Sequence, residues 1–515
     1  MHTKNSDEIT LNDMFIGYSD GELEANDDKF LELFYVENNK YKQIMSSSSK
    51  FIISGRKGTG KTILAKYIEK KELESNKLCK INKIGDFNIR CLIDLELREL
   101  HSKELMHFWK WTIYIGITEL ILKNPPKINK PKIFFSYHKL KTFYNKIYKV
   151  SKSRQGFIKE KIEETNSSRL AGGLNNKTTS FESKSDAEKA YSIKTIYKRA
   201  PYYSLLTELE TLIYNTLKHY EITFIYDDLD GIEDTIQDDS SYRNILISLI
   251  NIIKEINICF QKEKDIKCRL MVVIRDDILE TLHSYNSNLN KVTSDCEVKL
   301  YWASQPIPYS PEKHPLMDLV LTKIQKSVPQ FSDLNKKQLY KRLFPDKVDD
   351  KNIATYLLNF SMGRPRDVIN FLNIIKKNAS EEKAFTPSLF RAYKVEYSNT
   401  FYAELRNELS IHYKKEFVDD CLNILGDLKK IYFTYEIINK HYEANKTRYP
   451  NIEDIKVCID FLYKFSIIGN SWSDKSKKNR QKFKTSWAYR SDGNPIPNYE
   501  HTFIIHNALQ KHYSL

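Results

Sequence analysis

Eight residues near the start of the chain, GRKGTGKT, match the pattern G-x-x-x-x-G-K-[ST] of loops that hold nucleotide phosphates. Three of them are glycines, and without Cβ atoms the backbone can turn sharply and point successive N–H groups at phosphate oxygens. Lys61 is placed to reach the β- and γ-phosphates, and the Thr62 hydroxyl is placed to bind Mg²⁺. The pattern therefore predicts ATP and Mg²⁺ as cofactors and a nucleotide-binding set of Gly55, Arg56, Lys57, Gly58, Thr59, Gly60, Lys61, Thr62 and Ile63.

The residues on either side of this loop have the patterns of the elements that such a loop needs. KFIIS before it is typical of a buried strand, and TILAKYIEKKEL after it has the apolar spacing of a helix. The N-terminus of that helix would add its dipole to the anion site. The alternative is a surface turn rich in glycine and lysine, which the strand–loop–helix order disfavours.

A second apolar segment ends in two acids. The sequence ITFIYDDLDGIED, residues 222–234, has the apolar run of a strand that lies beside the first one. In a phosphate site Asp227 would hold Mg²⁺ through water, and Asp228 would orient or deprotonate the attacking water. We therefore predict Asp228 and Lys61 as catalytic residues, and Asp227 and Thr62 as the metal site. The alternative is a strand that leaves the core through an acidic turn.

A third apolar run, Leu270–Ile274, leads straight into Arg275. In P-loop ATPases with an additional strand, a polar residue at this strand tip senses the γ-phosphate, and an arginine can pair with it bidentately. Arg275 is therefore predicted as a catalytic sensor. An ion pair of Arg275 with Asp276, Asp277 or an acid of the preceding strand is an equally weighted alternative.

Two arginines stand farther along the chain, in GRPR at residues 363–366, at the front of an amphipathic helix. An arginine at such a start can reach across to a nucleotide held by the first domain and couple the helix position to the phosphate state. We predict Arg364 and Arg366 as nucleotide-binding residues. The alternative is a helix-capping loop with solvated arginines.

These four elements, in this order, resemble the AAA+/STAND class of P-loop ATPases. They are most similar to a group of bacterial ATPases, often encoded near phage-defence genes, with a GRKGTGKT-like loop, a VIRDD-like strand end, a strand like VKLYWAS and a helix like GRPRDVINFLN. The resemblance covers roughly residues 15–515 and implies a role in defence against phage. AAA+ members usually have Asp-Glu at the position of Asp227 and Asp228. This chain has Asp-Asp there, as many STAND proteins do, and the shorter second side chain implies slow ATP hydrolysis.

The predicted fold class is α/β, with a P-loop NTPase core built on a parallel sheet, an α-helical lid and a C-terminal winged-helix domain. The predicted domains are a lead-in at 1–45 that packs on the core, the core at 46–310, the lid at 311–416 and a winged-helix-like domain at 417–515. The last domain is predicted as helices followed by two strand-like segments, KFKTSWAYR and HTFIIHNAL. RCLIDLELREL, residues 90–100, is predicted as the second strand of the sheet.

Residues 124–200 are predicted as an insertion in the core that carries most of the net charge of +14. From 123 to 199 there are 19 lysines and arginines against 6 acidic residues, interleaved with aromatic residues. This composition suits a nucleic-acid backbone with bases stacked on rings. A helical hairpin whose rings form a small core of their own is the slightly favoured alternative. Basic residues between 475 and 484 modestly favour an acidic partner, nucleic acid or protein, for the winged helix.

The first functional interpretation is a slowly hydrolysing switch, in which ATP and Mg²⁺ hold core, lid and winged helix in one arrangement. The alternatives are a DNA-binding AAA+ loader or initiator, and a scaffold that binds ATP without turning it over. We expect homo-oligomers, because in such ATPases an arginine of one subunit can complete the next subunit's site. A separate effector protein is expected because the sequence has no nuclease, protease or deaminase constellation.

The sequence also predicts where the protein works. It has no basic-then-apolar start and no run of eighteen apolar residues. Its seven cysteines lack the spacing of a disulfide framework or a metal site. We therefore expect a cytoplasmic protein without membrane contact.

Overall fold

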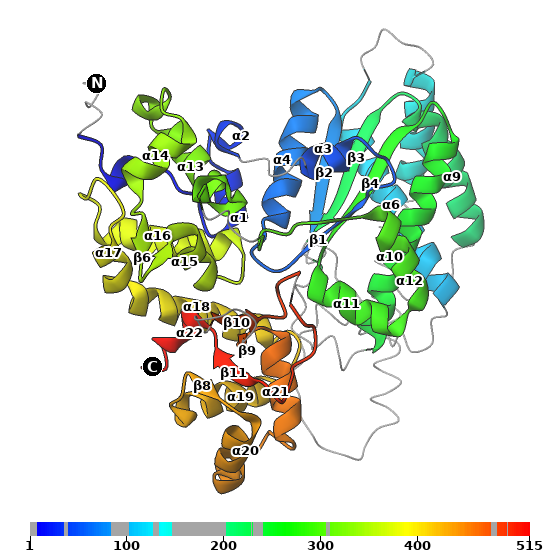
Figure 1. The fold of residues 1–515 in the computed structure, drawn as a ribbon. Coiled ribbons are helices and arrows are strands. Elements are labelled where there is room, and N and C mark those ends of the chain that lie inside the picture. Colours follow the sequence, from blue (N-terminus) through cyan, green and yellow to red (C-terminus); the bar gives the residue numbers. More distant parts are fainter. Residues whose placement is uncertain are drawn as a thin grey trace, which may run out of the picture.

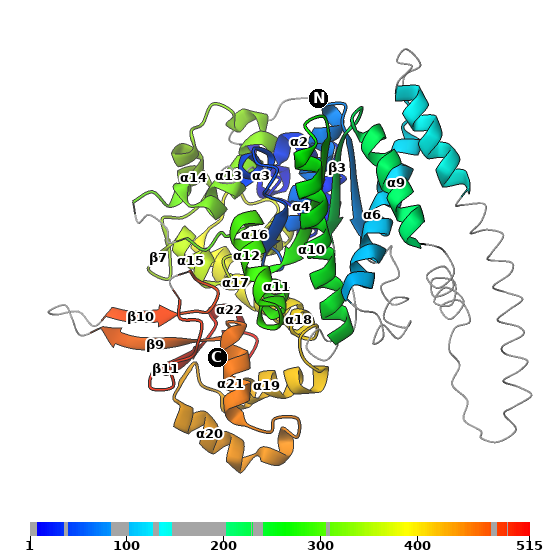
Figure 2. The ribbon, with the colours of Figure 1, turned by 90° about the vertical axis from the view of Figure 1, so that its right-hand side faces the viewer.

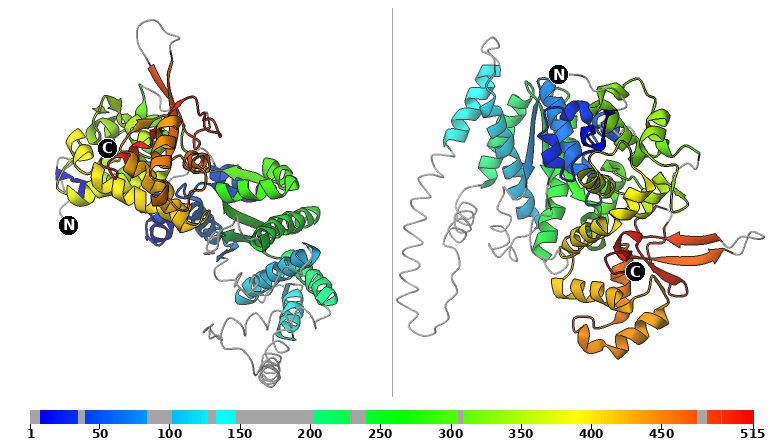
Figure 3. Two further views of the ribbon diagram at one scale, coloured as in Figure 1. Left: turned by 90° about the horizontal axis from the view of Figure 1, so that it is seen from below. Right: turned by 90° about the vertical axis from the view of Figure 1, so that its left-hand side faces the viewer.

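The structure is a computed structural model, and its elements form a helix-flanked sheet, a helical part beside it and a C-terminal part below the helices (Figure 1). A lead-in with η2 (Leu11–Asp13), α1 (Gly21–Ala25), α2 (Phe30–Leu33) and α3 (Lys40–Met45) precedes the sheet. Its helices α1 and α2 lie between the sheet and the helical part (Figures 1 and 3). The structure describes residues 8–34, 40–83, 102–126, 133–146, 202–227, 229, 240–304, 309–474, 482–491 and 493–515.

The central sheet has five parallel strands in the order β2-β3-β4-β1-β5. The prediction that the strand ending in Asp227 lies beside the loop strand is wrong, because β4 pairs with both and separates β3 from β1. The carboxyl ends of these three parallel strands still meet at one edge, where ligands bind in open α/β sheets. The predicted α/β fold class, with a parallel sheet, the glycine loop after a strand and a helical domain later in the chain, is confirmed. The strands are β1 (Ile52–Gly55), β2 (Leu78–Lys83), β3 (Glu221–Asp227), β4 (Lys267–Arg275) and β5 (Glu297–Lys299).

Helices cover both faces of the sheet, as a parallel sheet requires. α4 (Lys61–Glu74) covers the face toward the lead-in, and the other face is covered by α6 (Ser102–Lys123), α9 (Tyr202–Leu217) and α10 (Ser240–Lys262) (Figure 1). Successive residues of β4 point alternately into the two layers. The apolar run of β4 is continuous because both faces of the strand are buried under helices.

Among the described residues, one stretch, Tyr242–Lys262 of α10, is long and apolar enough to cross a membrane. Much of that stretch is inside the protein, because Ile245, Leu249 and Ile253 are buried in the core on one face of the sheet. The packing of a core helix therefore accounts for its composition.

The chain passes from β4 into the next helix without a loop. Arg275 is both the last residue of β4 and the N-cap of α11 (Asp276–Tyr285). α12 (Ser287–Cys296) then returns the chain to β5. This direct junction fixes Arg275 and Asp277 at the carboxyl edge of the sheet.

The strand next to β3 differs from the predicted one. The predicted strand at 90–100 lies outside the described residues, and β2 pairs with β3 in parallel. β2 has the sequence LCKINK, and five of its six residues are only partly buried because it is an edge strand. An edge strand of this kind lacks the apolar run by which the central strands can be recognised.

The helical part beside the sheet, residues 311–409, is called the lid below after its predicted role. It contains the predicted amphipathic helix, α16, which begins at Pro365 in the first turn where a missing N–H costs nothing. A two-stranded hairpin stands between α14 and α15. The elements are η6 (Pro311–Lys313), α13 (Pro315–Ser327), η7 (Pro329–Phe331), α14 (Lys336–Leu343), β6 (Lys347–Val348), β7 (Lys351–Asn352), α15 (Ile353–Asn359), α16 (Pro365–Asn378), α17 (Pro387–Ala392) and α18 (Lys394–Leu409).

The C-terminal part has an antiparallel sheet of order β10-β9-β11-β8, in which β8 precedes α20 and the other three strands follow α21. Its β9–β10 hairpin projects away from the helices (Figure 2). One prediction is wrong here: the helix expected over NIEDIKVCIDFLYKFSIIGN stops at Lys464, and its last residues belong to β9. Ser466 ends it with a left-handed φ of 59°. The elements are α19 (Lys415–Leu428), β8 (Tyr432–Phe433), α20 (Tyr435–Ala444), η8 (Lys446–Arg448), α21 (Ile455–Lys464), β9 (Ile468–Asp474), β10 (Lys482–Ser486), β11 (Thr502–Ile505) and α22 (Asn507–Gln510).

The lid and the C-terminal part share one hydrophobic core. Their buried side chains, from Leu316 to Tyr513, form a single cluster that also includes Ile9 and Met14 of the lead-in. The hydroxyl of Ser398 in α18 accepts the N–H of His512 at 2.8 Å and so ties the chain end to the lid. A movement of the lid would therefore carry the C-terminal part with it.

The described residues of the predicted insertion include a helix at 133–146. Its Tyr137 and Phe143 are buried in the core on one face of the sheet, whereas Phe134 and Phe135 are exposed. Some aromatic rings of the basic segment are therefore part of a hydrophobic core, whereas others face solvent.

Candidate functional site

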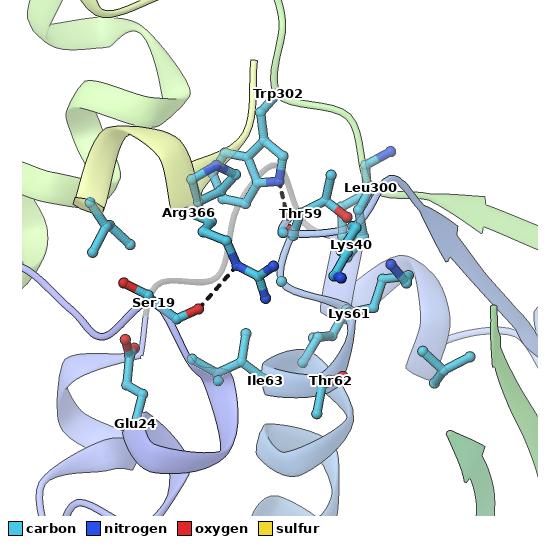
Figure 4. A pocket seen from close by; sticks show the side chains of 18 of the residues that line it. Ser19, Glu24, Lys40, Thr59, Lys61, Thr62, Ile63, Leu300, Trp302 and Arg366 are labelled. Carbon is cyan, nitrogen blue, oxygen red and sulfur yellow. Dashed lines mark hydrogen bonds between the residues drawn. The ribbon is translucent and has the colours of Figure 1, made fainter. Parts of the chain in front are cut away.

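The glycine loop between β1 and α4 lines a pocket at the carboxyl edge of the sheet (Figure 4). The other walls come from the lead-in, the tips of β3 and β4, and the lid helices α13 and α16. Three predicted site residues, Gly55, Arg56 and Arg364, are not part of this lining, and Asp228 lies outside the described residues. The predicted residues that do line it are Lys57, Gly58, Thr59, Gly60, Lys61, Thr62, Ile63, Asp227, Arg275 and Arg366.

The loop needs its glycines for conformation and for close approach. Gly58 and Gly60 have φ angles of 83° and 92°, in the left-handed region that favours glycine. A Cβ on Gly58 would lie 3.0 Å from the Cβ of Arg366. The missing side chain therefore also lets Arg366 of the lid lie close against the loop.

Lys61 and the two predicted metal ligands meet in the pocket. The Lys61 ammonium donates to the carbonyl oxygens of Gly55 and Arg56 at 2.9 and 3.0 Å, where phosphate oxygens would compete for it. Thr62 and the buried Asp227 offer a hydroxyl and a carboxylate, which suit Mg²⁺ when phosphate and water complete its shell. In the described part of the chain no group of three or more His, Cys, Asp or Glu side chains could hold a metal. The donor set fits an ion that arrives with a nucleotide.

Trp302, in the segment after β5, holds the loop from the side. Its indole N–H donates to the carbonyl of Thr59 at 3.0 Å, and the ring is buried. This contact of Trp302 is not predicted from the sequence. The feature of the sequence that could have indicated this contact is a single tryptophan just after the strand that neighbours the loop strand.

We expect Trp302→Phe to lower ATP affinity about fivefold, because it keeps an apolar ring and removes one hydrogen bond of about 1 kcal/mol that orders the loop. The measurement is the dissociation constant of ATP from calorimetric titration. Trp487→Phe is the matched control, since Trp487 is equally buried but lies in the C-terminal part. Equal losses in both variants would contradict the assigned contact.

Arg366 joins three parts of the protein at the pocket. Its backbone N–H donates to the carbonyl of Gly58 at 3.3 Å, and its Nε donates to the carbonyl of Ser19 at 3.2 Å (Figure 4). The lid, the loop and the lead-in are thereby connected through one residue. Of the two predicted lid arginines, Arg366 is the one whose side chain reaches the pocket.

Arg364 lies in a buried cluster of charges behind the loop. It donates to both oxygens of Asp367 at 2.9 and 3.0 Å and to Glu408 at 2.7 Å, and also to the carbonyl of Lys57 at 3.2 Å. The structure therefore gives Arg364 a contact with the loop backbone instead of the predicted nucleotide contact. Burial raises the pKa of Glu408, but Arg364 and Arg275 outweigh it and lower this pKa to about 2.

Arg275 at the tip of β4 forms an ion pair with Asp277, which is its predicted alternative role. Its Nε donates to Asp277 at 3.0 Å, and Glu408 lies 3.8 Å from its Nη2. The ring of His412 lies 2.7 Å from the other oxygen of Asp277. Burial raises the pKa of Asp277, but Arg275 and His412 hold it well below its usual range. Arg275 also lines the pocket, so this one residue contacts both the site and the charged cluster.

Arg56 points from the loop toward the C-terminal part and not into the pocket. Its guanidinium lies 3.7 Å from the sulfur of Met362 and 5.9 Å from the centre of the Tyr489 ring. Close by, the hydroxyl of Tyr301 accepts the N–H of Ser491 at 2.8 Å. The back of the loop is thus in contact with the chain that follows β10.

Comparisons with known proteins bear mainly on the lid. Residues 314–406 match a family model described as the FunZ-associated C-terminal helical domain. No curated protein matches the chain. Among solved structures it is similar to a Walker-type ATPase of Pyrococcus abyssi, with 10% identity, a TM-score of 0.36, and coverage of 98% of this chain and 100% of that chain. The segment matched by the family model includes the pocket residues Lys323 and Arg366.

Proposed function

We propose that this chain is a P-loop ATPase that binds ATP, hydrolyses it slowly and acts as a switch. The proposal depends on one observation: a single pocket unites Lys61, Thr62 and Asp227 with Arg275 and Arg366 from other elements. Backbone N–H groups of the loop and the N-terminus of α4 provide the anion site. Thr62 and Asp227 would hold Mg²⁺, which neutralises charge on the phosphates.

The pocket favours one direction for the nucleotide. The γ-phosphate points toward the tips of β3 and β4, because Asp227 and Arg275 lie there. The nucleoside then points toward the lead-in and the lid, where Tyr18 and Ile369 offer apolar surface together with Ile63 of α4.

Contacts of the loop with the lid support a switch. Both lid arginines donate hydrogen bonds to loop carbonyls, so a change in loop conformation reaches the lid directly. If Arg275 exchanges Asp277 for the γ-phosphate, the released carboxylate also changes the charge beside His412, which follows α18. ATP would then favour an arrangement of the lid and the C-terminal part that ADP does not.

Within this proposal we assign the chain to the AAA+/STAND class. The position of β4 between β1 and β3 supports the class, and helices followed by an antiparallel hairpin support a winged helix. The chain would act in the cytoplasm as a homo-oligomer, with a separate effector, in bacterial defence against phage. That role derives from the resemblance of the loop and the helix at 363–373.

One observation favours the alternative function, a DNA-binding loader or initiator. Phe134 and Phe135 are 44% and 62% exposed, and the ammonium of Lys139 lies 4.4 Å from the centre of the Phe135 ring. Exposed rings beside lysines are surfaces on which bases stack. Retention of the chain on immobilised DNA that declines with added salt would support this function.

The switch proposal is tested with Asp228→Asn. We expect this variant to bind ATP as the wild type does and to lose about 100-fold or more in single-turnover hydrolysis, because it lacks the carboxylate that activates water. Asp265→Asn, at an exposed turn before β4, is the control. A wild type that binds ATP but is as inert as Asp228→Asn would be a nucleotide-locked scaffold, and a wild type that binds no ATP would refute the whole proposal.

A further inference from the structure

The nucleoside end of the pocket contains a buried ion pair, Glu24 of α1 and Lys323 of α13. Their side chains are 3% and 4% exposed, and both line the pocket. One oxygen of Glu24 accepts from Lys323, and the other accepts the backbone N–H of Tyr18 at 2.9 Å. Within the described part of the chain, Glu24 is the hydrogen-bond partner of Lys323, and an ammonium has three donors. The pair therefore has both acceptor and donor capacity left for a ligand.

Apolar groups surround this pair. Leu319 and Ile369 of the lid line the pocket with it. The backbone of Gly17 packs closely against the same groups, since a Cβ at this position would lie 3.0 Å from Glu24 Oε2 and 3.2 Å from Ile369 Cδ1. Burial lowers the pKa of Lys323, and the charge of Glu24 opposes that effect. An apolar slot with a few convergent polar groups is the usual design of a site that orients a flat heteroaromatic ring.

Building on the ATP site proposed above, we propose that Glu24 and Lys323 select adenine over other purines. Glu24 accepts a hydrogen bond from the exocyclic amino group, and Lys323 donates to the ring nitrogen beside it. Adenine presents such a donor next to an acceptor, whereas guanine and hypoxanthine have a carbonyl oxygen in place of the amino group. For a base held in the position of adenine, that oxygen would face the carboxylate of Glu24 and leave two buried acceptors without a donor, which costs binding free energy.

The first test changes only the ligand. Dissociation constants of ATP, GTP and inosine triphosphate are measured on the full-length wild type with Mg²⁺. We expect ATP to bind about ten- to a hundredfold more tightly than the other two, because one bidentate base contact discriminates by that factor. Equal affinities would overturn the inference and leave the proposed ATP site intact. Failure of all three nucleotides to bind would instead remove the proposed function itself.

The second test uses the double variant Glu24→Gln/Lys323→Met. Both charges are removed together, so no lone charge remains buried. We expect the preference for ATP over inosine triphosphate to fall to within about threefold, since a Gln amide can turn to meet either an amino group or a carbonyl.

The matched control is Lys326→Met. Lys326 also connects α13 to the lead-in, through the carbonyl of Glu32 at 2.6 Å, but it does not line the pocket. This variant is expected to keep the full preference for ATP. The inference is overturned if the double variant keeps the wild-type preference, or if Lys326→Met loses it equally, because the ion pair would then only tether the lead-in.

Discussion

Lys61→Ala is expected to lower ATP affinity at least about tenfold and single-turnover hydrolysis about 100-fold or more. The lysine brings a positive charge and several donors to the phosphates, and a charge-assisted hydrogen bond of this kind contributes about 1.5–3 kcal/mol to binding. It also stabilises charge that develops during transfer, where the loss of one donor typically costs about 100- to 1000-fold in rate. Calorimetric titration and a quenched single-turnover assay measure the two effects separately.

The control for this variant lies on the same helix. Lys66 of α4 pairs with Glu69 at 3.0 Å on the partly exposed side of the helix, and it does not line the pocket. Lys66→Ala therefore removes a lysine from α4 without touching the phosphate site. If Lys61→Ala and Lys66→Ala bound ATP equally well, the glycine loop would not be the phosphate site.

Much of this site is visible in the sequence because its parts are local. The loop is contiguous, and its conformation depends on Gly58 and Gly60, whose need for positive φ is a property of the residues themselves. Asp227 and Arg275 end apolar strands, and the carboxyl ends of parallel strands meet at the same sheet edge. The partner Asp277 was also foreseeable, because it is two residues from Arg275.

The remaining contacts depend on tertiary packing that no local pattern contains. His412 reaches Asp277 across 135 positions, and Trp302 reaches the Thr59 carbonyl across 243. The sequence of the GRPR segment is equally compatible with Arg364 or Arg366 in the pocket. Glu408 of α18 decides between them, because its ion pair with Arg364 holds that arginine outside the pocket.

Arg364→Ala is the substitution for which we expect the largest loss of stability, about 3–5 kcal/mol in the free energy of unfolding. Arg364 is 2% exposed and neutralises two buried acids, Asp367 at 2.9 Å and Glu408 at 2.7 Å. Without it the two carboxylates remain buried, and Arg275, 3.8 Å from Glu408, is a counter-charge that stays in the cluster. Urea unfolding followed by fluorescence measures the change.

Arg391→Ala separates burial from the mere loss of an ion pair. Arg391 pairs with Asp349 at 3.0 Å, but the two side chains are 58% and 43% exposed. Because water already solvates both charges, its removal should cost no more than about 1 kcal/mol. The difference between the two variants reports what it costs to leave carboxylates behind the loop without their partner. If both variants lost the same stability, the cluster would be solvated in solution and could not transmit the state of the loop to α18.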